Sequence, residues 1–367
     1  MSAVDSPKPP AEEDPPSRSL PPVEAPTGSF ILQLFLIPLV IVTMVVMVWL
    51  MFSWLAHMGQ DDPKTIITQL RKRDDSFGQR AYELAEQLRS PDPQFDKLRS
   101  DPELLKELIS LLEADLDLKT KEKPDEVRLK RRMFLCRAVG SFHIPDGVPV
   151  LIRCVQDSTT ENANVQLSAL EAITTLAKNV GPEEIRDEKD LLATVLAASR
   201  VADDESPPPA PASSKDGESF YKPRGEVRAV AAYTLGVLGG PEAEERLATM
   251  LTFETYPNAR YNAATGLARR GDVRCIPVLK EMLQTDNPLA AKDERGERDK
   301  DNKRVIVLRN GIQTTVILAQ KNPSADLTTL QEALQKIIDS DLAAIKTDRS
   351  KLQIAAKEAQ RMLAKRK

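Results

Sequence analysis

Arginine recurs at matching positions along this chain, and it is the side chain best suited to recognising an anion. Arg228 and Arg260 are 32 residues apart, and Arg132 occupies the matching place in an earlier, similar segment. A guanidinium group donates hydrogen bonds in a planar fork that fits the oxygens of a carboxylate or phosphate. We favour a structural role for these three arginines, as a ladder of hydrogen bonds and ion pairs between units.

A positive groove is the alternative for the same residues. Arg269, Arg270 and Arg274 would extend it along the chain. The acidic residues between these arginines keep the local charge near neutral, whereas an anion-binding stripe normally shows a basic excess. An anion-binding groove is therefore the less favoured interpretation.

Residues that bind metals or carry acid–base catalysis are scarce. His57 and His143 are the two histidines, and neither has a Cys or His partner at zinc-like spacing. The three cysteines, an odd number without close pair spacing, predict reduced and packed thiols, although Cys136 and Cys154 could face each other across two helices. No phosphate-binding glycine loop or Gly-x-Ser-x-Gly motif occurs. The sequence predicts no catalytic residue, no metal site and no cofactor.

Pairs of acidic residues occur at three places. We expect a structural role for these pairs and not a catalytic one, because carboxylates cap and stabilise helix starts or lie solvated in loops. The pairs are Asp61–Asp62, Glu183–Glu184 and Asp203–Asp204.

Composition restricts the fold and the partner. Charged residues make up 29% of the chain with a formal net charge of -4, so we expect no nucleic-acid partner. Aromatic residues make up only 4% of the chain, whereas Ala and Leu are abundant, as small-residue packing between helices requires. The fold class is therefore predicted to be all-α.

The run Phe30–Leu55 contains no charged residue in 26 positions. A bilayer core is about 30 Å thick and a helix rises about 1.5 Å per residue, so this run is long enough to cross a membrane with some tilt. Pro38 is compatible with a membrane helix, and Trp49 and Trp54 mark one headgroup edge. The sequence predicts a transmembrane helix and not a buried core helix, which is rarely apolar on every face.

A cleaved signal peptide is the closest alternative to that helix. A signal peptide begins with basic residues that lead directly into an apolar stretch, whereas 29 residues with eight prolines precede this run. Residues 1–29 are predicted to be a disordered tail. Arg18 alone precedes the span closely, whereas Lys64 and the basic run Arg71–Arg73 follow it. This bias predicts a single-pass inner-membrane protein with an outside amino terminus and a cytoplasmic body, and a periplasmic body is the alternative.

Two apolar helices recur as a unit along the centre of the chain. The segment Glu226–Leu251 is followed 32 residues later by a similar segment, and units at 127–157 and 164–200 show the same order of helix, turn and helix. A period in the low thirties with two amphipathic helices per unit predicts an α-solenoid. Gly239 and Gly271 are expected to end the first helices in the left-handed conformation.

At these residues the chain resembles the HEAT repeats, and most closely the short HEAT-like variety of the phycobilisome lyases. The resemblance implies an α-solenoid and almost nothing about chemistry. With the membrane span, the chain also resembles membrane-anchored bacterial HEAT-repeat proteins of unknown role. The matching stretches are Glu226–Ala229, Leu235–Gly236, Leu238–Gly239, Ala259–Arg260, Arg270–Asp272 and Ile276–Pro277.

Changes in composition divide the chain into segments. After the tail and the span at 30–55, we expect membrane-proximal helices, two blocks of repeats, two insertions and C-terminal helices. The Pro-rich insertion and the charged insertion are expected to be solvated linkers, which solenoids tolerate well, and a binding loop is the alternative for either. The boundaries are 60–125 for the membrane-proximal helices, 126–200 and 226–286 for the repeats, 201–225 and 287–302 for the insertions, and 303–367 for the C-terminal helices.

These features predict a scaffold that presents an extended helical surface to another, unidentified protein and has no catalytic activity of its own. The bilayer is the second partner, through residues 30–55. The lyase resemblance implies the alternative, an enzyme or an accessory factor. That role would require a polar, convergent pocket on the concave face, for which the sequence supplies no obvious members.

Overall fold

The structure is a computed structural model that describes residues 27–58, 77–117, 126–157, 163–200 and 224–365, except 293, 295 and 344. The chain divides into two compact units, Met1–Asp61 and Asp62–Lys367. Each unit is described by itself.

The described part of the first unit is the helix α1, Gly28–Met58. Its segment Phe35–Trp54 has a mean hydropathy of 2.8, and none of it is buried in the unit. The helix is long and apolar enough to cross a membrane, although a signal sequence near the amino terminus would pass the same test. Pro38 lies inside the helix without ending it.

The second unit consists of helices and turns over its described residues, which confirms the all-α prediction. Its α-helices are α3 (Phe77–Arg89), α4 (Asp96–Arg99), α5 (Pro102–Asp117), α6 (Glu126–Gly140), α7 (Val148–Gln156), α8 (Ala163–Val180), α9 (Pro182–Arg186), α10 (Leu191–Ala198), α11 (Arg224–Leu238), α12 (Pro241–Phe253), α13 (Pro257–Ala268), α14 (Ile276–Met282), α15 (Glu297–Lys321), α16 (Thr328–Asp339) and α17 (Arg349–Ala364). Short 3-10 turns, η1 (Pro93–Phe95), η2 (Pro145–Gly147), η4 (Val273–Cys275) and η5 (Leu289–Ala291), connect some of them.

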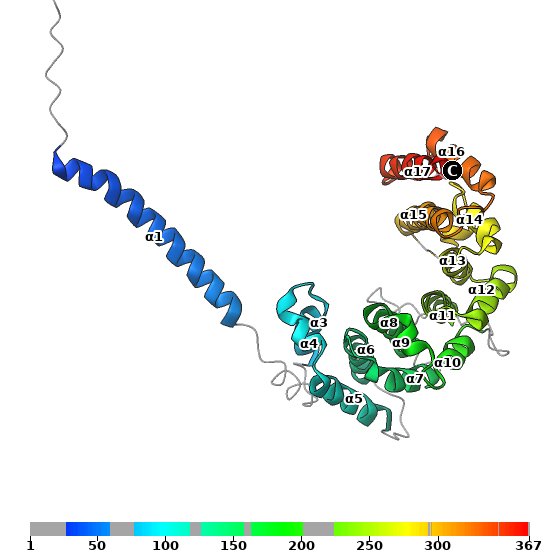
Figure 1. The fold of residues 1–367 in the computed structure, drawn as a ribbon, viewed down its shortest axis with the longest axis horizontal. Coiled ribbons are helices and arrows are strands. Elements are labelled where there is room, and N and C mark those ends of the chain that lie inside the picture. Colours follow the sequence, from blue (N-terminus) through cyan, green and yellow to red (C-terminus); the bar gives the residue numbers. More distant parts are fainter. Residues whose placement is uncertain are drawn as a thin grey trace, which may run out of the picture. The chain divides into compact units, whose positions relative to one another are not determined.

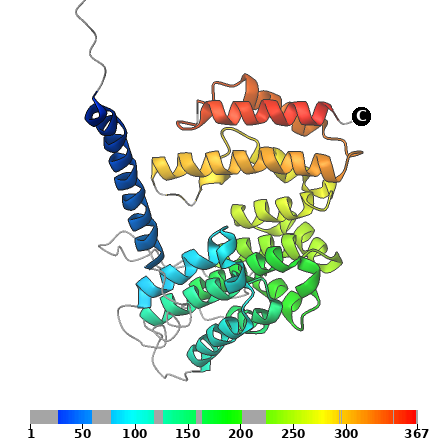
Figure 2. The ribbon, with the colours of Figure 1, turned by 60° about the vertical axis from the view of Figure 1, so that its left-hand side comes forward.

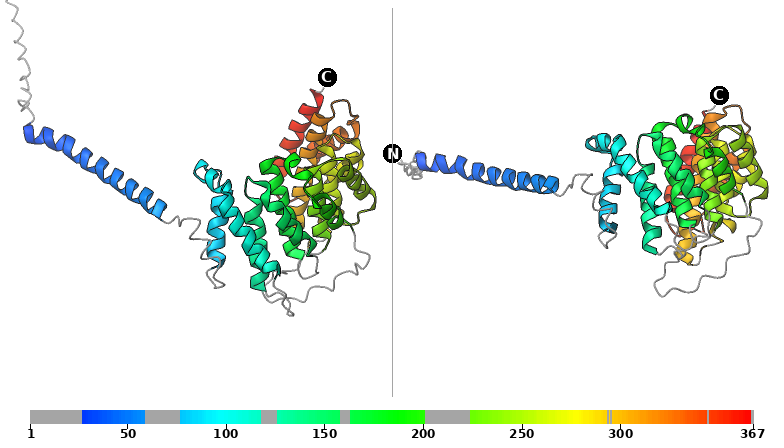
Figure 3. Two further views of the ribbon diagram at one scale, coloured as in Figure 1. Left: turned by 60° about the horizontal axis from the view of Figure 1, so that its bottom comes forward. Right: turned by 90° about the horizontal axis from the view of Figure 1, so that it is seen from below.

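The helices of the second unit alternate between two layers, as an α-solenoid requires. The first helices of successive hairpins, α6, α8, α11, α13 and α15, lie on the inner side of the curve that this unit follows, and α7, α10, α12, α14 and α16 lie on its outer side (Figure 1). Figure 3 shows the successive helices of this unit side by side. The predicted solenoid is therefore confirmed, and each hairpin buries its apolar face against its neighbours.

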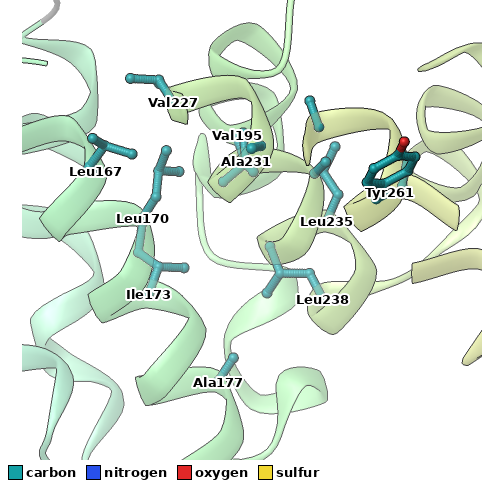
Figure 4. Packing of buried hydrophobic residues seen from close by; sticks show 14 of the residues in the cluster. Leu167, Leu170, Ile173, Ala177, Val195, Val227, Ala231, Leu235, Leu238 and Tyr261 are labelled. Carbon is teal, nitrogen blue, oxygen red and sulfur yellow. The ribbon is translucent and has the colours of Figure 1, made fainter. Parts of the chain in front are cut away.

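Small residues set the distance between successive first helices. A Cβ atom added to Gly236 of α11 would lie 2.6 Å from the Cα atom of Gly266 in α13, and one added to Gly140 of α6 would lie 2.5 Å from the Cα atom of Ala172 in α8. No side chain fits at these two contacts, so the backbones touch. Larger apolar side chains then fill the space around the contacts, and Figure 4 shows Ile173 of α8 and Leu235 of α11 within this core.

The predicted helix ends are confirmed at both glycines. Gly239 and Gly271 have φ angles of 66° and 77°, in the left-handed region that suits glycine at a helix end. The amide of Asp272 donates to the carbonyl of Leu267 at 3.1 Å, which closes the end of α13. The predicted start at Asp101 is also present, because its carboxylate accepts from the amides of Glu103 at 2.9 Å and Leu104 at 3.2 Å.

The charged insertion at 287–302 differs from the expected solvated linker. Helix α15 already begins at Glu297, so the last residues of the insertion are helical. Asp301 is buried, and its carboxylate accepts from the amides of Lys346 at 2.6 Å and Thr347 at 3.1 Å. Hydropathy alone predicts that a charged residue such as Asp301 lies in a solvated loop. In the structure its buried carboxylate instead ties α15 to the segment before α17. Figure 2 shows these long helices at the C-terminal end of the stack.

Several predictions fall outside the described residues. These are the disordered tail up to residue 26, the basic residues Lys64 and Arg71–Arg73, the acidic pairs Asp61–Asp62 and Asp203–Asp204, and residues 201–223 of the Pro-rich insertion predicted at 201–225. Its last two residues, Arg224 and Gly225, belong to α11.

Overpacking should destabilise the layer of first helices. Ala232 of α11 and Ala264 of α13 are both 0% exposed. Replacing either by Leu inserts three heavy atoms into a close-packed contact and should lower the free energy of unfolding by about 1–3 kcal/mol. The measurement is thermal unfolding of the full chain in detergent, followed by helical circular dichroism. Ala114→Leu, on the exposed side of α5, is the matched control and should unfold like the wild type. Equal melting temperatures for all three variants would contradict the core positions of Ala232 and Ala264.

Candidate interaction surface

The first helices leave one side uncovered. Each of them contacts its neighbours on two sides and a second helix on a third, so the remaining stripe is the least buried. On α11 this stripe comprises Glu226, Val230, Tyr233 and Val237, spaced by three or four residues, as one face of a helix requires. We call the surface of α6, α8, α11 and α13 that points away from the second helices the inner face (Figure 1). The corresponding stripe on α13 comprises Asn258, Asn262, Thr265 and Arg269.

The three recurrent arginines do not lie free on this face. Arg132 pairs with Asp157 at 3.1 Å, where α7 ends. Arg228 pairs with Glu254, where α12 ends, through Nε at 3.0 Å and Nη2 at 3.2 Å. Each pair therefore joins the first helix of a hairpin to the end of the second helix of the same hairpin.

Arg260 follows the same rule and pairs with Glu281 of α14 at 2.5 Å. The three pairs therefore close each unit on itself, and Arg132 also donates to the carbonyl of Asp115 in α5, the preceding helix, as the expected ladder between units requires. These pairs form because an arginine side chain is long enough to extend across its own hairpin to the carboxylate near the end of the second helix. The side chains of Arg228 and Glu254 are only 7% and 1% exposed, so this pair is not accessible to a ligand.

Other side chains connect successive units. The amide of Asn179 donates to the carbonyl of Phe142 at 3.2 Å, and that of Asn322 donates to the carbonyl of Gly271 at 2.9 Å. Arg270 donates to the carbonyl of Val237 at 3.2 Å. In each case a later helix satisfies a carbonyl at the end of the preceding first helix, where the helix leaves acceptors unpaired. These bonds form the ladder between units, and two predicted arginines belong to it: Arg270, and Arg132 through its bond to the carbonyl of Asp115 in α5.

Arg274 is partnered at the surface. Its guanidinium group bonds Asp272 at 2.7 Å and Glu245 at 3.0 Å, and it is 47% exposed. The structure therefore does not bring Arg269, Arg270 and Arg274 into one positive groove. Of the six predicted arginines, Arg269 lies on the inner face.

Arg269 meets two residues that the sequence analysis did not single out. Its Cζ atom lies 4.9 Å from the centre of the Tyr233 ring, and the ammonium group of Lys178 lies 4.7 Å from the same centre. Lys178 also donates to the Tyr233 hydroxyl at 2.7 Å. Two cations, one from α8 and one from α13, thus hold one aromatic ring on α11. We call these three residues the inner-face cluster.

The electrostatics of the cluster favour negative charge. Burial raises the pKa of the Tyr233 hydroxyl, but the hydrogen bond from Lys178 and the charges of Lys178 and Arg269 outweigh it and leave the pKa below its ordinary value. The sequence signal that could have found this cluster is the outward stripe of α11 together with a cation in the last turn of α8. It becomes readable only once the register between hairpins is known.

The cysteines and histidines have structural positions. Cys136, Cys154 and Cys275 are free and buried, which agrees with the predicted packed thiols. A hydrogen bond with Cys154 and burial hold the pKa of Cys136 well above its ordinary value, so the thiol stays protonated. His143 is exposed in the predicted turn, where its amide donates to the carbonyl of Arg99 at 2.9 Å. Over the described residues, no three acidic, His or Cys side chains gather as a metal site.

A cavity of about 420 Å³ lies between α7, α8 and α10. Three of its polar side chains bond one another or the backbone, since Gln156 donates to Thr194 at 2.9 Å and Gln166 donates to the carbonyl of Val155 at 2.7 Å. It lies against the second helices and not on the inner face, and its donors are already used.

The two kinds of arginine should differ sharply in their effect on stability. Arg228→Ala leaves the buried carboxylate of Glu254 without its cation and should cost about 3–5 kcal/mol. Arg274→Ala removes an exposed pair and should cost at most about 1 kcal/mol. Urea unfolding of the two variants beside the wild type measures the difference. Similar midpoints for both variants would contradict a buried, structural Arg228.

Known proteins agree with this architecture. The family model described as HEAT repeats matches residues 219–294, the stretch that contains α11 to α14. No curated protein matches the chain. A similar solved structure is the complex of CpcE and CpcF of phycocyanin lyase from Nostoc sp. PCC7120, with 18% identity over 83% of this chain and 95% of that chain and a TM-score of 0.40. The stretch 219–294 thus matches the HEAT repeats, and the helical hairpins that the structure describes there agree with that match.

Proposed function

We propose that this chain is a membrane-anchored scaffold whose second unit presents the inner face to another protein. The observation that carries the proposal is the division of polar groups in the repeats. Arginines and asparagines are used within and between hairpins, whereas the inner face keeps a partly exposed stripe with a half-buried aromatic side chain and two cations. Aromatic side chains and arginine are enriched where proteins bind proteins.

The anchor in this proposal is α1. Large apolar side chains along it, such as Phe35, Met47 and Trp49, are 66–70% exposed in their unit. Transfer of such a helix from water into the hydrocarbon core of a bilayer is favourable. Trp49 and Trp54 fit the headgroup level at its C-terminal end. We propose that α1 stays in the mature protein as a single span with the second unit in the cytoplasm.

The proposed topology predicts where a fused reporter is active. Alkaline phosphatase fused after Lys367 should be inactive, because it folds only outside the cytoplasm, whereas a green fluorescent protein fused there should fluoresce. The comparison is made in intact cells with both fusions at equal levels. An active phosphatase with a dark fluorescent fusion would place the body outside the cytoplasm and would reverse the proposed orientation.

The scaffold proposal predicts which side of the repeats meets a partner. A photo-crosslinking phenylalanine derivative at Thr175, an exposed residue of α8 on the inner face, should yield a discrete crosslinked product in intact cells. The same probe at Lys280, an exposed residue of α14 in the outer layer, is the matched control and should not yield that product. Immunoblotting and mass spectrometry of the products make the measurement. No product from Thr175, or the same product from both positions, would contradict a binding role of the inner face.

A further inference from the structure

The carboxylates of the inner face have bonding partners, whereas two of its cations lack a carboxylate partner among the described residues. The carboxylate of Glu171 lies 3.7 Å from Arg137, and that of Glu226 accepts a hydrogen bond from the Tyr256 hydroxyl. Within the part of the chain that the structure describes, Lys178 and Arg269 form no ion pair with a carboxylate. The acidic groups of this face are therefore engaged, and two of its cations lack a counter-charge.

The inner-face cluster also keeps an unused donor. The Nη1 atom of Arg269 is buried and finds no acceptor over the described residues. A buried donor without an acceptor costs free energy, so an incoming acceptor would be favoured there. Both cations lie at helix ends, Lys178 in the last turn of α8 and Arg269 at the C-cap of α13. The helix dipole stabilises the two charges at those ends but leaves the Nη1 donor unpaired.

We propose that the inner-face cluster, Lys178, Tyr233 and Arg269, binds the carboxylates of an acidic, extended segment of a partner protein. This inference rests on the proposed scaffold function and names the chemistry of its partner. Carboxylates fit both cations, and the guanidinium group of Arg269 bonds such oxygens in a planar fork. Val230 and Val237 flank Tyr233 on the same stripe and offer apolar surface to the bound segment beside the two cations.

An acidic peptide fits this face better than an anionic lipid surface does. The first helices lie on the inner side of the curve of their unit, so a flat bilayer cannot lie along them (Figure 1). Glu171 and Glu226 also belong to the same face and would be repelled by a sheet of phosphate groups. A narrow chain can reach the two cations and pass beside these carboxylates.

A direct binding measurement tests the inference. The full chain is placed in phosphatidylcholine nanodiscs and titrated into a fluorescein-labelled peptide of alternating Glu and Leu, and fluorescence polarisation is read. We expect saturable binding that weakens as salt rises, and little binding of the matching Gln and Leu peptide. Lys178→Glu and Arg269→Glu should each weaken binding about tenfold or more, because each places a like charge against the peptide. Arg274→Glu, whose side chain is partnered away from the inner face, should change the affinity by less than about twofold.

The outcomes separate the alternatives. Equal binding of the Glu and Gln peptides, or undiminished binding by Lys178→Glu and Arg269→Glu variants that melt like the wild type, would overturn the inference. If a charge reversal prevents folding, Lys178→Gln and Arg269→Gln replace it, and each should still weaken binding. Binding of glycerophosphoglycerol in place of the peptide, lost in Lys178→Gln, would assign the cluster to a lipid headgroup and also overturn it. If the product crosslinked from Thr175 persists in the charge-reversed variants, the acidic partner is wrong while the scaffold function stands.

Discussion

Direct contact between the backbones of successive first helices is the constraint on which the rest of this structure depends. Gly236 and Gly266 approach so closely that neither position has room for a Cβ atom, and Gly140 lies equally close to Ala172. Dispersion and apolar burial both grow as helices approach, so these contacts bring Leu235 and Ala264 into a fully buried core. A solenoid is stabilised by such neighbour contacts, because a hairpin alone exposes too much apolar surface.

Close packing also decides where the polar groups lie. Once the first helices touch, the carbonyl groups at their ends face the next hairpin, and side chains such as Asn179 and Asn322 reach them. The side chains of Arg228 and Arg260 extend the other way, across their own hairpin, and Arg228 meets Glu254 where both are almost fully buried. Both arrangements remove polar side chains from solvent and from ligands. On the inner face, by contrast, Lys178 and Arg269 form no ion pair with a carboxylate over the described residues.

The sequence predicts the parts of this structure that follow from local pattern. Gly239, Gly271 and Asp101 mark helix ends through backbone geometry and capping, and the structure confirms each of them. The partner of a recurrent arginine is not local, because a period gives the spacing of the units and not the direction in which a long side chain extends. For the same reason the meeting of Lys178, Tyr233 and Arg269 could not be predicted, since it depends on the register between three hairpins.

That register links the core to the surface. Gly236 lies one helical turn after Tyr233, and Gly266 lies one turn before Arg269, so the backbone contact between α11 and α13 also fixes the distance between ring and guanidinium group. On the other side, the hydroxyl groups of Thr174 and Thr234 bond at 2.9 Å; Thr174 lies one turn before Lys178. The packing that stabilises the stack therefore positions the cluster with little side-chain freedom left to lose. A binding surface built in this way costs little ordering entropy when a partner arrives, because folding has already supplied that order.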